Sequence, residues 1–513
     1  MGFSLLLACI VVTLVTIHAV YILHKSKGNK RSSSSSVPLP PSVPGPVGHP
    51  VLGNLLYVIG PLRRNPHRAL AALAEVHGPV VSLRLGLTRT LVVVSSPAVA
   101  REALSKHDAA LAARLVPDNV RALSYSATSL VFLPSSDNLW RQGRAVIGAG
   151  FSSGRGLDRV RPVLERHAGR LAGHFAACAG RPVVVREALN GTVLNVIANV
   201  LFSRDVVDVR AGAPPQMFKG LIAPVLQGWS KPSVCDAFSF LAPLEHLLGS
   251  RRRISVHLAK LFKFFDKEII ERRLASGEKH DDLLDVLLAR HAMSKLTRQQ
   301  IITFLTDMFI AASDTSTVTV QRAMAQLLRH PEKMEKVRAE LAERLGSNPN
   351  DIVKESDLDK LPYLQAVVKE TLRLHPAVPL IPREVVADGV SLGGFPVPIG
   401  TGIVVNLWAI GRDPKAWSQP EEFMPERFLD EKVVHSDSKG FDFAYKPFGA
   451  GRRVCPGMDY TARSVPLLLA SLLHKTEWRL PDGMAPEDID LSDRYGTVLD
   501  LATPLTAVPV PIV

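Results

Sequence analysis

The segment from Thr297 to Pro331 is the longest stretch of the chain that can form one uninterrupted helix. Thr297 and Gln300 have the spacing of a capping box, and no further proline occurs before Pro331. The helix would contain about 33 residues and would be roughly 50 Å long, which is unusual in a globular protein. This stretch therefore predicts a body in which helices dominate.

The rest of the chain predicts more helices and a few short strands. A second clear helix begins near Pro362 and stops at His375, because a proline follows. Val80 to Val94 alternates like a pair of strands with Gly86 near its turn. Further helices are expected over 65–77, with Asn65 as N-cap, over 98–107, and after Pro456; strand-like segments continue to Asn406, and 411–454 reads as irregular. The expected fold class is mainly α with small β-sheets.

Composition excludes several classes of protein. Hydrophobic residues make up 46% of the chain and charged residues 21%, whereas a disordered chain needs low hydrophobicity and high charge. Four widely spaced cysteines exclude a disulfide scaffold and a zinc finger. The net charge is +13, but the basic residues are dispersed and form no nucleic-acid-binding stripe. An anionic membrane surface or an acidic protein partner explains this charge better.

The first residues predict a membrane anchor. Phe3 to Leu23 is almost wholly apolar and would span roughly 31 Å as a helix, enough to cross a bilayer core. Lysines and an arginine follow at once, which keeps the following chain in the cytosol, and a cleaved secretory signal fits less well. We therefore expect three parts: an anchor over 1–24, a basic, Ser- and Pro-rich linker over 25–50, and one large domain over 51–513.

The most informative segment runs from Pro447 to Gly457 and is called the cysteine loop below. Three glycines and two prolines surround Cys455, which describes a tight loop that brings backbone close to a bulky group. Cys455 stands at the start of the last helix, where free N–H groups and the helix dipole favour a thiolate. Arg453 adds a cation nearby. Taken alone, the residues also allow a buried structural cysteine in a turn.

The pattern Phe448-x-x-Gly451-x-Arg453-x-Cys455-x-Gly457 resembles the haem-thiolate signature of the cytochrome P450 monooxygenases at every position. This resemblance implies the cytochrome P450 fold and a haem b (iron protoporphyrin IX) cofactor, with the Cys455 thiolate as axial ligand of the iron. It also implies that Phe448 packs near the thiolate and that Arg453 pairs with a haem propionate. The likeness extends over nearly the whole chain and is greatest to plant microsomal members of the geraniol-hydroxylase-like branch.

A second group of residues resembles the structural triad of this family. Glu370 and Arg373 stand three residues apart on one helix face, and Arg427 lies in a later Pro-Glu-Arg-Phe segment. By itself such a pair is usually an exposed ion pair. The resemblance implies instead a buried triad of all three residues that holds the cysteine loop against the helix. Losing one member should then destabilise the protein by several kcal/mol.

The middle of the long helix resembles the oxygen-binding segment of the same family. Ala311, Ser313, Asp314, Thr315 and Ser316 fit its pattern, while Ala312 stands where glycine is usual. The resemblance implies that Asp314 and Thr315 form a catalytic acid–alcohol pair that delivers protons through water in a dry pocket. The alternative is that both side chains only bond back to helix carbonyls.

Further contacts with haem and substrate follow from the resemblance alone. Trp140, Arg144 and Arg383 would contact the haem propionates. The substrate pocket would be lined by the segments 119–132, 377–381 and 497–499 and, among single positions, by Leu305, Met308, Phe309, Ala312, Val378, Leu380 and Val498. Most of these side chains are apolar, which suits terpene skeletons held by burial.

The resemblance thus implies a haem-thiolate monooxygenase anchored in the endoplasmic-reticulum membrane, with its catalytic domain in the cytosol. It would hydroxylate a hydrophobic small molecule, such as a monoterpenoid or diterpenoid, with O2 and electrons from NADPH. These electrons would come through NADPH–cytochrome P450 reductase, whose acidic face complements the basic excess. Two alternatives stay open: a haem-thiolate isomerase or dehydratase that acts on hydroperoxides without external electrons, and a catalytically silent haem-binding or scaffold protein.

Overall fold

A computed structural model describes residues 42–511 except 50–51, 56, 58–63, 88, 210–217, 232, 246–248, 347–351, 430–442 and 475. The expected membrane anchor and most of the expected linker therefore lie outside the described residues. Within the described ranges, no helix combines the length and the apolar character that a membrane crossing requires.

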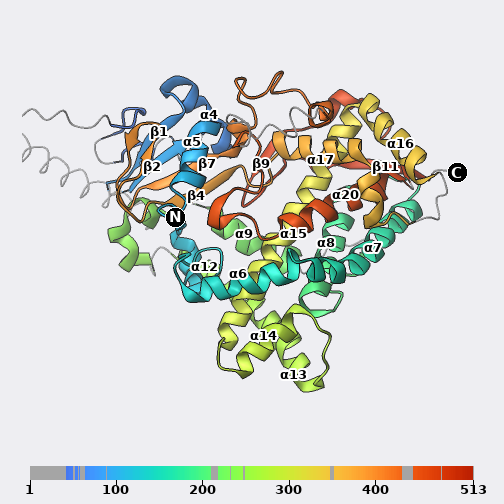
Figure 1. Cartoon of the computed structure of the whole chain (residues 1–513), viewed down its shortest axis with the longest axis horizontal. Coiled ribbons are helices and arrows are strands. Elements are labelled where there is room, and N and C mark those ends of the chain that lie inside the picture. Colours follow the sequence, from blue (N-terminus) through green and yellow to red (C-terminus); the bar gives the residue numbers. More distant parts are fainter. Residues whose placement is uncertain are drawn as a thin grey trace, which may run out of the picture.

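The long central helix is α15 (Arg298–Arg329), which contains 32 residues and crosses the middle of the molecule (Figure 1). It begins with the expected capping box: the Gln300 N–H donates to Thr297 Oγ1 at 3.2 Å, and the Thr297 N–H donates to Gln300 Oε1 at 2.8 Å. It ends just before Pro331, as predicted. From residue 301 to 328 every residue is buried except Ala311, Ala312 and Thr315.

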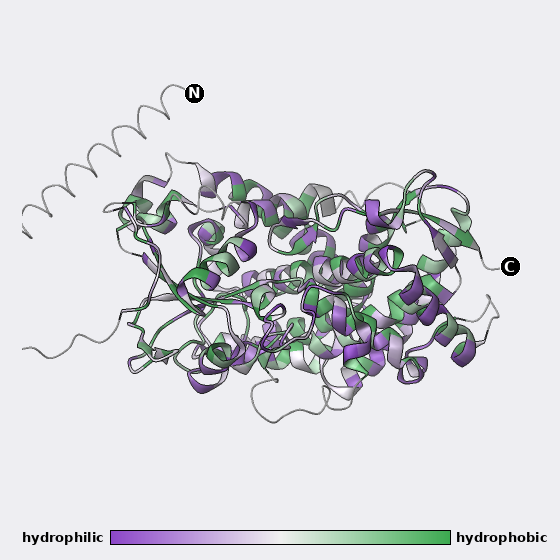
Figure 2. Cartoon of the chain, turned by 90° about the horizontal axis from the view of Figure 1, so that it is seen from above, coloured by the Kyte–Doolittle hydropathy of each residue, from purple (hydrophilic) through white to green (hydrophobic). Residues whose placement is uncertain are grey.

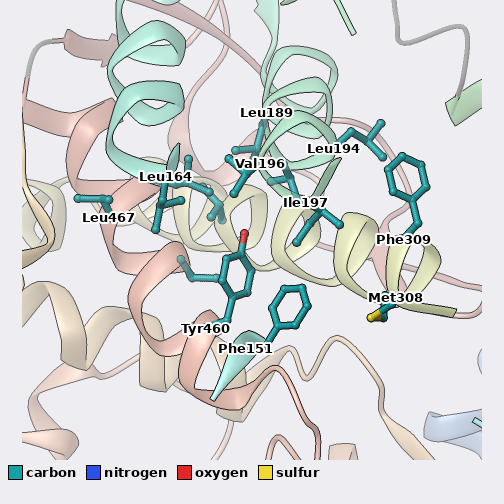
Figure 3. Packing of buried hydrophobic residues seen from close by; sticks show 14 of the residues in the cluster. Phe151, Leu164, Leu189, Leu194, Val196, Ile197, Met308, Phe309, Tyr460 and Leu467 are labelled. Carbon is teal, nitrogen blue, oxygen red and sulfur yellow. The ribbon is translucent and has the colours of Figure 1, made fainter. Parts of the chain in front are cut away.

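Three helices make the most extensive contacts with α15, and a further helix covers two of them. α8 (Val185–Phe202), α17 (Pro362–Leu374) and α20 (Met458–His474) contact α15, while α7 (Gly154–Ala177) lies over α8 and α20. Figure 3 shows how side chains of these helices meet, among them Leu189 and Ile197 of α8 and Leu467 of α20. Burial of this apolar surface supplies the main stabilisation of the helical part.

A small sheet forms the other end of the molecule (Figure 1). Its strands are β1 (Val80–Leu85), β2 (Arg89–Val94), β7 (Gly402–Asn406) and β4 (Leu380–Glu384), in that order. β1 and β2 form the predicted antiparallel pair, whose turn contains Gly86 with φ 65°. β2 pairs with β7 in parallel, and β4 pairs with β7 antiparallel.

The remaining strands form three smaller sheets. They are β3 (Val183–Val184), β11 (Thr506–Pro511) and β8 (Thr476–Arg479) in one sheet, β9 (Asp493–Tyr495) with β10 (Leu499–Leu501), and β5 (Ser391–Leu392) with β6 (Phe395–Pro396). The described residues therefore confirm a mainly helical fold with small sheets.

Shorter helices connect and cover these parts. The α-helices are α4 (Pro66–His77), α5 (Pro97–Arg101), α6 (Asn138–Phe151), α9 (Ala223–Trp229), α10 (Val234–Ala237), α12 (Ser250–Lys263), α13 (Arg272–Ser276), α14 (Leu283–Ala292), α16 (Pro331–Leu345) and α18 (Leu407–Ile410). Most helices carry both hydrophilic and hydrophobic residues around their circumference, as amphipathic helices do (Figure 2).

Segments with 3-10 or π geometry complete the description. They are η1 (Glu102–Lys106), η2 (Asp118–Ala127), η4 (Phe218–Ile222), η5 (Ser239–Leu244), η6 (Phe264–Glu271), η7 (Glu355–Lys360), η8 (Pro425–Phe428), η10 (Gly451–Arg453) and η11 (Pro486–Asp488). The helix expected over 98–107 is thus α5 continued by the π-helical η1. Asn65 occupies the N-cap position of α4, as predicted, but its side chain makes no capping hydrogen bond.

Candidate functional site

The cysteine loop precedes α20, and a backbone hydrogen bond between Cys455 and Phe448 closes it. The Cys455 N–H donates to the Phe448 carbonyl oxygen at 3.0 Å, and Arg144 Nη2 on α6 donates to the Val454 carbonyl oxygen at 3.0 Å. Burial raises the pKa of the Cys455 thiol, while the Gly457 N–H and the guanidinium groups of Arg144 and Arg114 lower this pKa. The loop therefore holds a half-buried sulfur beside two cations.

Gly451 explains why this part of the loop needs glycine. Its φ is +70°, and a Cβ atom there would collide with the Asp108 carboxylate and the Leu104 carbonyl oxygen. Asp108 follows η1 and accepts a hydrogen bond from the Arg452 N–H at 2.9 Å. The loop backbone is thus packed against the end of η1, while its approach to a bulky group stays a prediction.

Arg453 points away from solvent and bonds to the segment between η1 and α6. Its Nε donates to the Ala112 carbonyl oxygen at 2.7 Å, and its Nη1 donates to the Leu130 carbonyl oxygen at 3.3 Å. Its guanidinium lies 4.9 Å from the ring centroid of Trp140, and that of Arg144 lies 5.7 Å from the same ring. The structure therefore brings Arg453, Trp140 and Arg144 together, as the resemblance implied.

Four arginines gather beside the cysteine loop and are called the arginine cluster below: Arg114, Arg144, Arg383 and Arg453. Arg114 and Arg383 both donate to the Pro382 carbonyl oxygen, at 3.5 and 3.0 Å. Burial, followed by the charges of Arg114 and Arg453, lowers the pKa of Arg383 to about 8. No carboxylate among the described residues forms an ion pair with any of the four.

One buried nitrogen of this cluster, Arg114 Nε, and one of the adjacent ring, Trp140 Nε1, have no hydrogen-bond partner within the described part of the chain. Buried cations and unpaired donors are costly unless an anion and acceptors meet them. A bound group with carboxylates would supply both the anion for the arginines and the acceptors for the unpaired donors, and a metal in this group could bind the Cys455 sulfur. The residues present therefore fit a haem. Sequence reasoning missed Arg114, and no local pattern marks it.

Glu370 forms a closed network with two arginines. Arg373 Nε and Nη2 donate to its two carboxylate oxygens at 2.7 and 2.8 Å, and Arg427 Nε donates to Oε1 at 3.0 Å. The Met424 N–H adds a fourth hydrogen bond at 2.8 Å. The side chains of Glu370 and Arg373 are fully buried, so the predicted triad is present as a complete network.

The triad acts on a different segment from the one expected. Arg373 donates to the carbonyl oxygens of Gly411, Pro420 and Glu422, so it bonds to the irregular stretch between α18 and η8. Among the described residues, no hydrogen bond of the triad reaches the cysteine loop. The link to that loop is packing: the rings of Phe428 and Tyr445 lie 5.0 Å apart, just before Pro447.

Asp314 and Thr315 point to different partners. The Thr315 hydroxyl donates to the Ala311 carbonyl oxygen at 3.0 Å, so this side chain bonds back to its own helix. Asp314 instead accepts from Arg186 Nη2 on α8 at 2.5 Å, and Arg186 also lies 3.3 Å from Asp500. Burial raises the pKa of Asp314, and the Arg186 charge lowers it. Sequence reasoning missed Arg186, which lies 128 residues from Asp314.

The predicted pocket residues of α15 differ in how far their side chains are exposed. Ala312 is half-buried and Met308 is 6% exposed, whereas Leu305 and Phe309 are fully buried. Phe309 packs between Phe202 and Phe265, with ring centroids 6.4 and 5.6 Å away, and leaves α15 on the opposite side from Met308 (Figure 3). Leu305, Met308 and Phe309 all belong to the buried core of the described chain, and their assignment to the pocket stays a prediction.

The later pocket segments do meet. The Leu499 N–H donates to the Ala377 carbonyl oxygen at 2.9 Å, which joins 497–499 to 377–381. Val378 is 39% exposed, and Leu380 and Val498 are half-buried. A separate cleft of about 480 Å³ lies between α6, α7, α8 and α14 and contains none of the predicted site residues.

The cysteine loop, the arginine cluster and the long α15 are the features on which membership of a family can be judged. The family model "Cytochrome P450" matches residues 43–503, so the chain belongs to the cytochrome P450 family, whose members are monooxygenases. Membership implies a haem cofactor.

Individual relatives agree with the expected branch. The chain is 45% identical to Cytochrome P450 76M5 of Oryza sativa subsp. japonica over 98% of each chain. It is 45% identical to Oryzalexin E synthase of the same rice, over 93% of each. Identity to Geraniol 8-hydroxylase of Catharanthus roseus is 39%, over 91% of this chain and 93% of that protein. The likeness to plant terpenoid-modifying cytochromes P450 is thus confirmed.

A solved structure gives the same fold. A zebra fish cytochrome P450 with progesterone has a TM-score of 0.74 and 28% identity, covering 87% of this chain and 99% of that one. The expected cytochrome P450 fold is confirmed.

Proposed function

We propose that this protein hydroxylates a hydrophobic terpenoid, inserting one oxygen atom of O2 into a C–H bond. The observation that carries the proposal is the Cys455 sulfur beside four buried or half-buried arginines that have no carboxylate partner in the described part of the chain. Relatives named Geraniol 8-hydroxylase and Oryzalexin E synthase support the substrate class.

The residues that would hold the haem follow from this arrangement. Cys455 would ligate the iron, and Phe448 would pack beside the sulfur. Arg144, Arg383 and Arg453, with Trp140, would meet the propionates, and Arg114 joins this set because its Nε is buried without a partner within the described ranges. When bound, the haem supplies the activation of O2 and the oxidising power for the C–H bond.

Proton delivery is assigned to Asp314 and Thr315. Thr315 lies with Ala311 and Ala312 on the only part of α15 that is not buried between residues 301 and 328. Its Oγ1 can therefore hold and pass a proton on that side. Asp314 pairs with Arg186, which also pairs with Asp500, and Asp500 pairs in turn with Arg494, whose side chain is 57% exposed. Because a guanidinium stays protonated and cannot relay a proton, these ion pairs hold the Asp314 carboxyl in position.

Substrate is held mainly by apolar contacts. Met308 and Ala312 on α15 and the joined segments 377–381 and 497–499 provide them. Such a lining excludes water and suits a carbon skeleton with few polar groups.

Electron supply and location complete the proposal. Electrons come from NADPH through NADPH–cytochrome P450 reductase, and the net charge of +13 favours docking to an acidic partner face. Phe3 to Leu23 anchors the protein in the endoplasmic-reticulum membrane, with the catalytic domain in the cytosol.

The test compares Cys455→Ser with Cys178→Ser, a half-buried cysteine at the end of α7. Wild type and Cys178→Ser should show the red-shifted Soret band of the reduced carbon monoxide complex, and Cys455→Ser should lose it. Wild-type microsomes with reductase and NADPH should convert a member of a terpenoid panel to a product heavier by one oxygen atom.

An unchanged spectrum in Cys455→Ser would refute the assignment of the ligand. Turnover of hydroperoxides without NADPH, and none of terpenoids with it, would instead establish the isomerase or dehydratase alternative.

A further inference from the structure

Asp307 is a buried carboxylate on α15 that the proposed reaction does not use. It lies one turn before Ala311 and is 4% exposed. Three donors meet it: the Tyr125 hydroxyl, the Ser129 hydroxyl at 2.8 Å and the Leu130 N–H at 2.7 Å. No cation of the described residues forms an ion pair with it. All three donors belong to one segment, residues 118–133, called the roof loop below.

The roof loop depends on contacts with neighbouring elements for its conformation, because its own backbone is irregular. Leu123 and Ser124 have φ of 50° and 56°, in the left-handed region, and they break η2 at this point. Residues held in this region persist only where surrounding contacts determine them. The hydrogen bonds to Asp307, and one between the hydroxyls of Thr128 and Thr303 at 3.0 Å, are such contacts from α15.

Leu130 shows that the contact with Asp307 reaches the cysteine loop. Its N–H donates to Asp307, and its carbonyl oxygen accepts from Arg453 Nη1 at 3.3 Å. Its side chain lies on Gly143 of α6, where a Cβ atom would collide with it. One residue of the roof loop is thus held from three sides, by α15, by α6 and by the cysteine loop.

Tyr125, which also bonds to Asp307, packs against α9 and α12. Its ring stacks on Trp229 of α9, with centroids 4.8 Å apart, and lies 6.3 Å from Phe262 of α12. The Asn119 side chain also donates to the carbonyl oxygens of Gly228 and Lys231, at 3.2 and 2.8 Å. The roof loop therefore connects α15 to the α9–α12 region through the partners of Asp307.

We propose that Asp307 is a positioning residue that sets the roof loop relative to α15 and Arg453, and that it thereby determines how strongly the pocket discriminates between ligands of different size. The inference rests on the proposed function only in that it takes the space beside Ala311 and Ala312 as the ligand pocket. A loop that is ordered before binding loses less entropy when a large ligand contacts it. A small ligand that does not reach the loop gains nothing from this order.

The variants are Asp307→Asn, Tyr125→Phe and the control Thr306→Val. The variants are compared at pH 8, where the Asp307 carboxyl is ionised because its pKa is raised only to about 7. Asparagine keeps the shape but has only one acceptor oxygen, so at least one of the three donors then faces an NH2 group. Tyr125→Phe removes one donor and keeps the stack on Trp229. Thr306 is fully buried on the same helix, and its hydroxyl bonds only to the Ile302 carbonyl oxygen in the described chain, so its loss leaves the roof loop unchanged.

The first measurement is hydrogen exchange of peptides from 118–133 in the full-length protein. Exchange should accelerate about tenfold in Asp307→Asn and less in Tyr125→Phe, and Thr306→Val should match wild type. This measurement does not depend on haem. Unchanged exchange in both Asp307→Asn and Tyr125→Phe would overturn the proposal.

The second measurement uses imidazole and 4-phenylimidazole as probes, titrated by their shift of the Soret band. The preference for 4-phenylimidazole over imidazole should fall about tenfold in Asp307→Asn and about threefold in Tyr125→Phe, with no change in Thr306→Val. The double variant should be no worse than Asp307→Asn, because both residues belong to one network. Reduced haem content with an unchanged preference would show a merely structural role and would overturn the proposal.

The two proposals fail separately. A wild-type protein without a Soret band would refute the proposed function, and hydrogen exchange would still decide whether Asp307 holds the roof loop. If Asp307→Asn does not fold, Tyr125→Phe and Ser129→Ala remove single donors and give the same decision.

Discussion

The protein contains two groups of buried arginines that differ in how their charge is met. In the triad, Arg373 and Arg427 share the Glu370 carboxylate, and the nearby carbonyl oxygens take up their remaining donors. In the arginine cluster, burial and then neighbouring guanidinium groups lower the pKa of Arg114, Arg383 and Arg453, and within the described ranges no carboxylate pairs with the four arginines. The first group thus has its anion within the chain, whereas the second has none among the described residues. A buried charge thus marks a ligand site only where its partner is missing.

Glu370→Ala is the strongest way to break this comparison. It turns the triad into a second group of unpaired arginines, so the unfolding free energy should fall by about 3–5 kcal/mol. Little protein with a Soret band should then be recovered. Urea denaturation and absorbance spectra measure both effects.

The matched control is Glu268→Ala, because Glu268 pairs with Arg272 at 2.6 Å and the two side chains are 45% and 61% exposed. Its loss should change stability by less than about 1 kcal/mol. An equal loss of unfolding free energy in both variants would mean that burial does not make the triad more important for stability than an exposed ion pair.

Asp307 extends the comparison to an unpaired buried carboxyl. Burial raises its pKa to about 7, against the hydrogen bonds from Tyr125, Ser129 and Leu130, which lower it. Between about pH 4 and pH 7 the folded state keeps this proton while the unfolded state releases it, so stability should fall as pH rises through this window. Because one pKa unit is worth about 1.4 kcal/mol, the fall can reach roughly 4 kcal/mol.

Thermal unfolding of wild type and Asp307→Asn between pH 4 and 7 checks this dependence. The amide does not titrate, so the variant should lose this part of the decrease. Parallel curves for the two proteins would contradict the raised pKa of Asp307.

Arg383→Met should give the smallest effect. It distinguishes the two arginine groups because the stability of the haem-free protein should change in opposite directions when an arginine of each group is removed. Removing an unneutralised cation should leave the haem-free protein as stable as before or more stable, while haem is released about tenfold faster. Transfer of haem to apomyoglobin measures the release. Arg373→Met, in the triad, should destabilise the haem-free protein, and the same loss in Arg383→Met would remove the distinction.

The parts predicted well are those whose signals are local. The capping box of Thr297 and the proline at 331 defined α15, and Pro362 and Pro376 defined α17. Gly451 and Cys455 marked the tight loop before α20. In each case the physical cause acts within a few residues of the position that reveals it.

The parts predicted poorly depend on contacts between distant segments. Phe309 belongs to the buried core together with Met308, and only the fold decides that Phe202 and Phe265 are the rings that surround Phe309. Arg186 reaches Asp314 across 128 residues. The triad was predicted correctly as a set, but its attachment to 411–427 rather than to the cysteine loop follows from the path of an irregular segment.

From the order of amino acids alone came the helical class, the long central helix and the tight loop around Cys455, because caps, prolines and glycines act on the backbone beside them. Only the tertiary structure decided which buried charges are neutralised. That depends on which side chains meet when segments far apart in the chain are brought out of water together, and no local pattern records it.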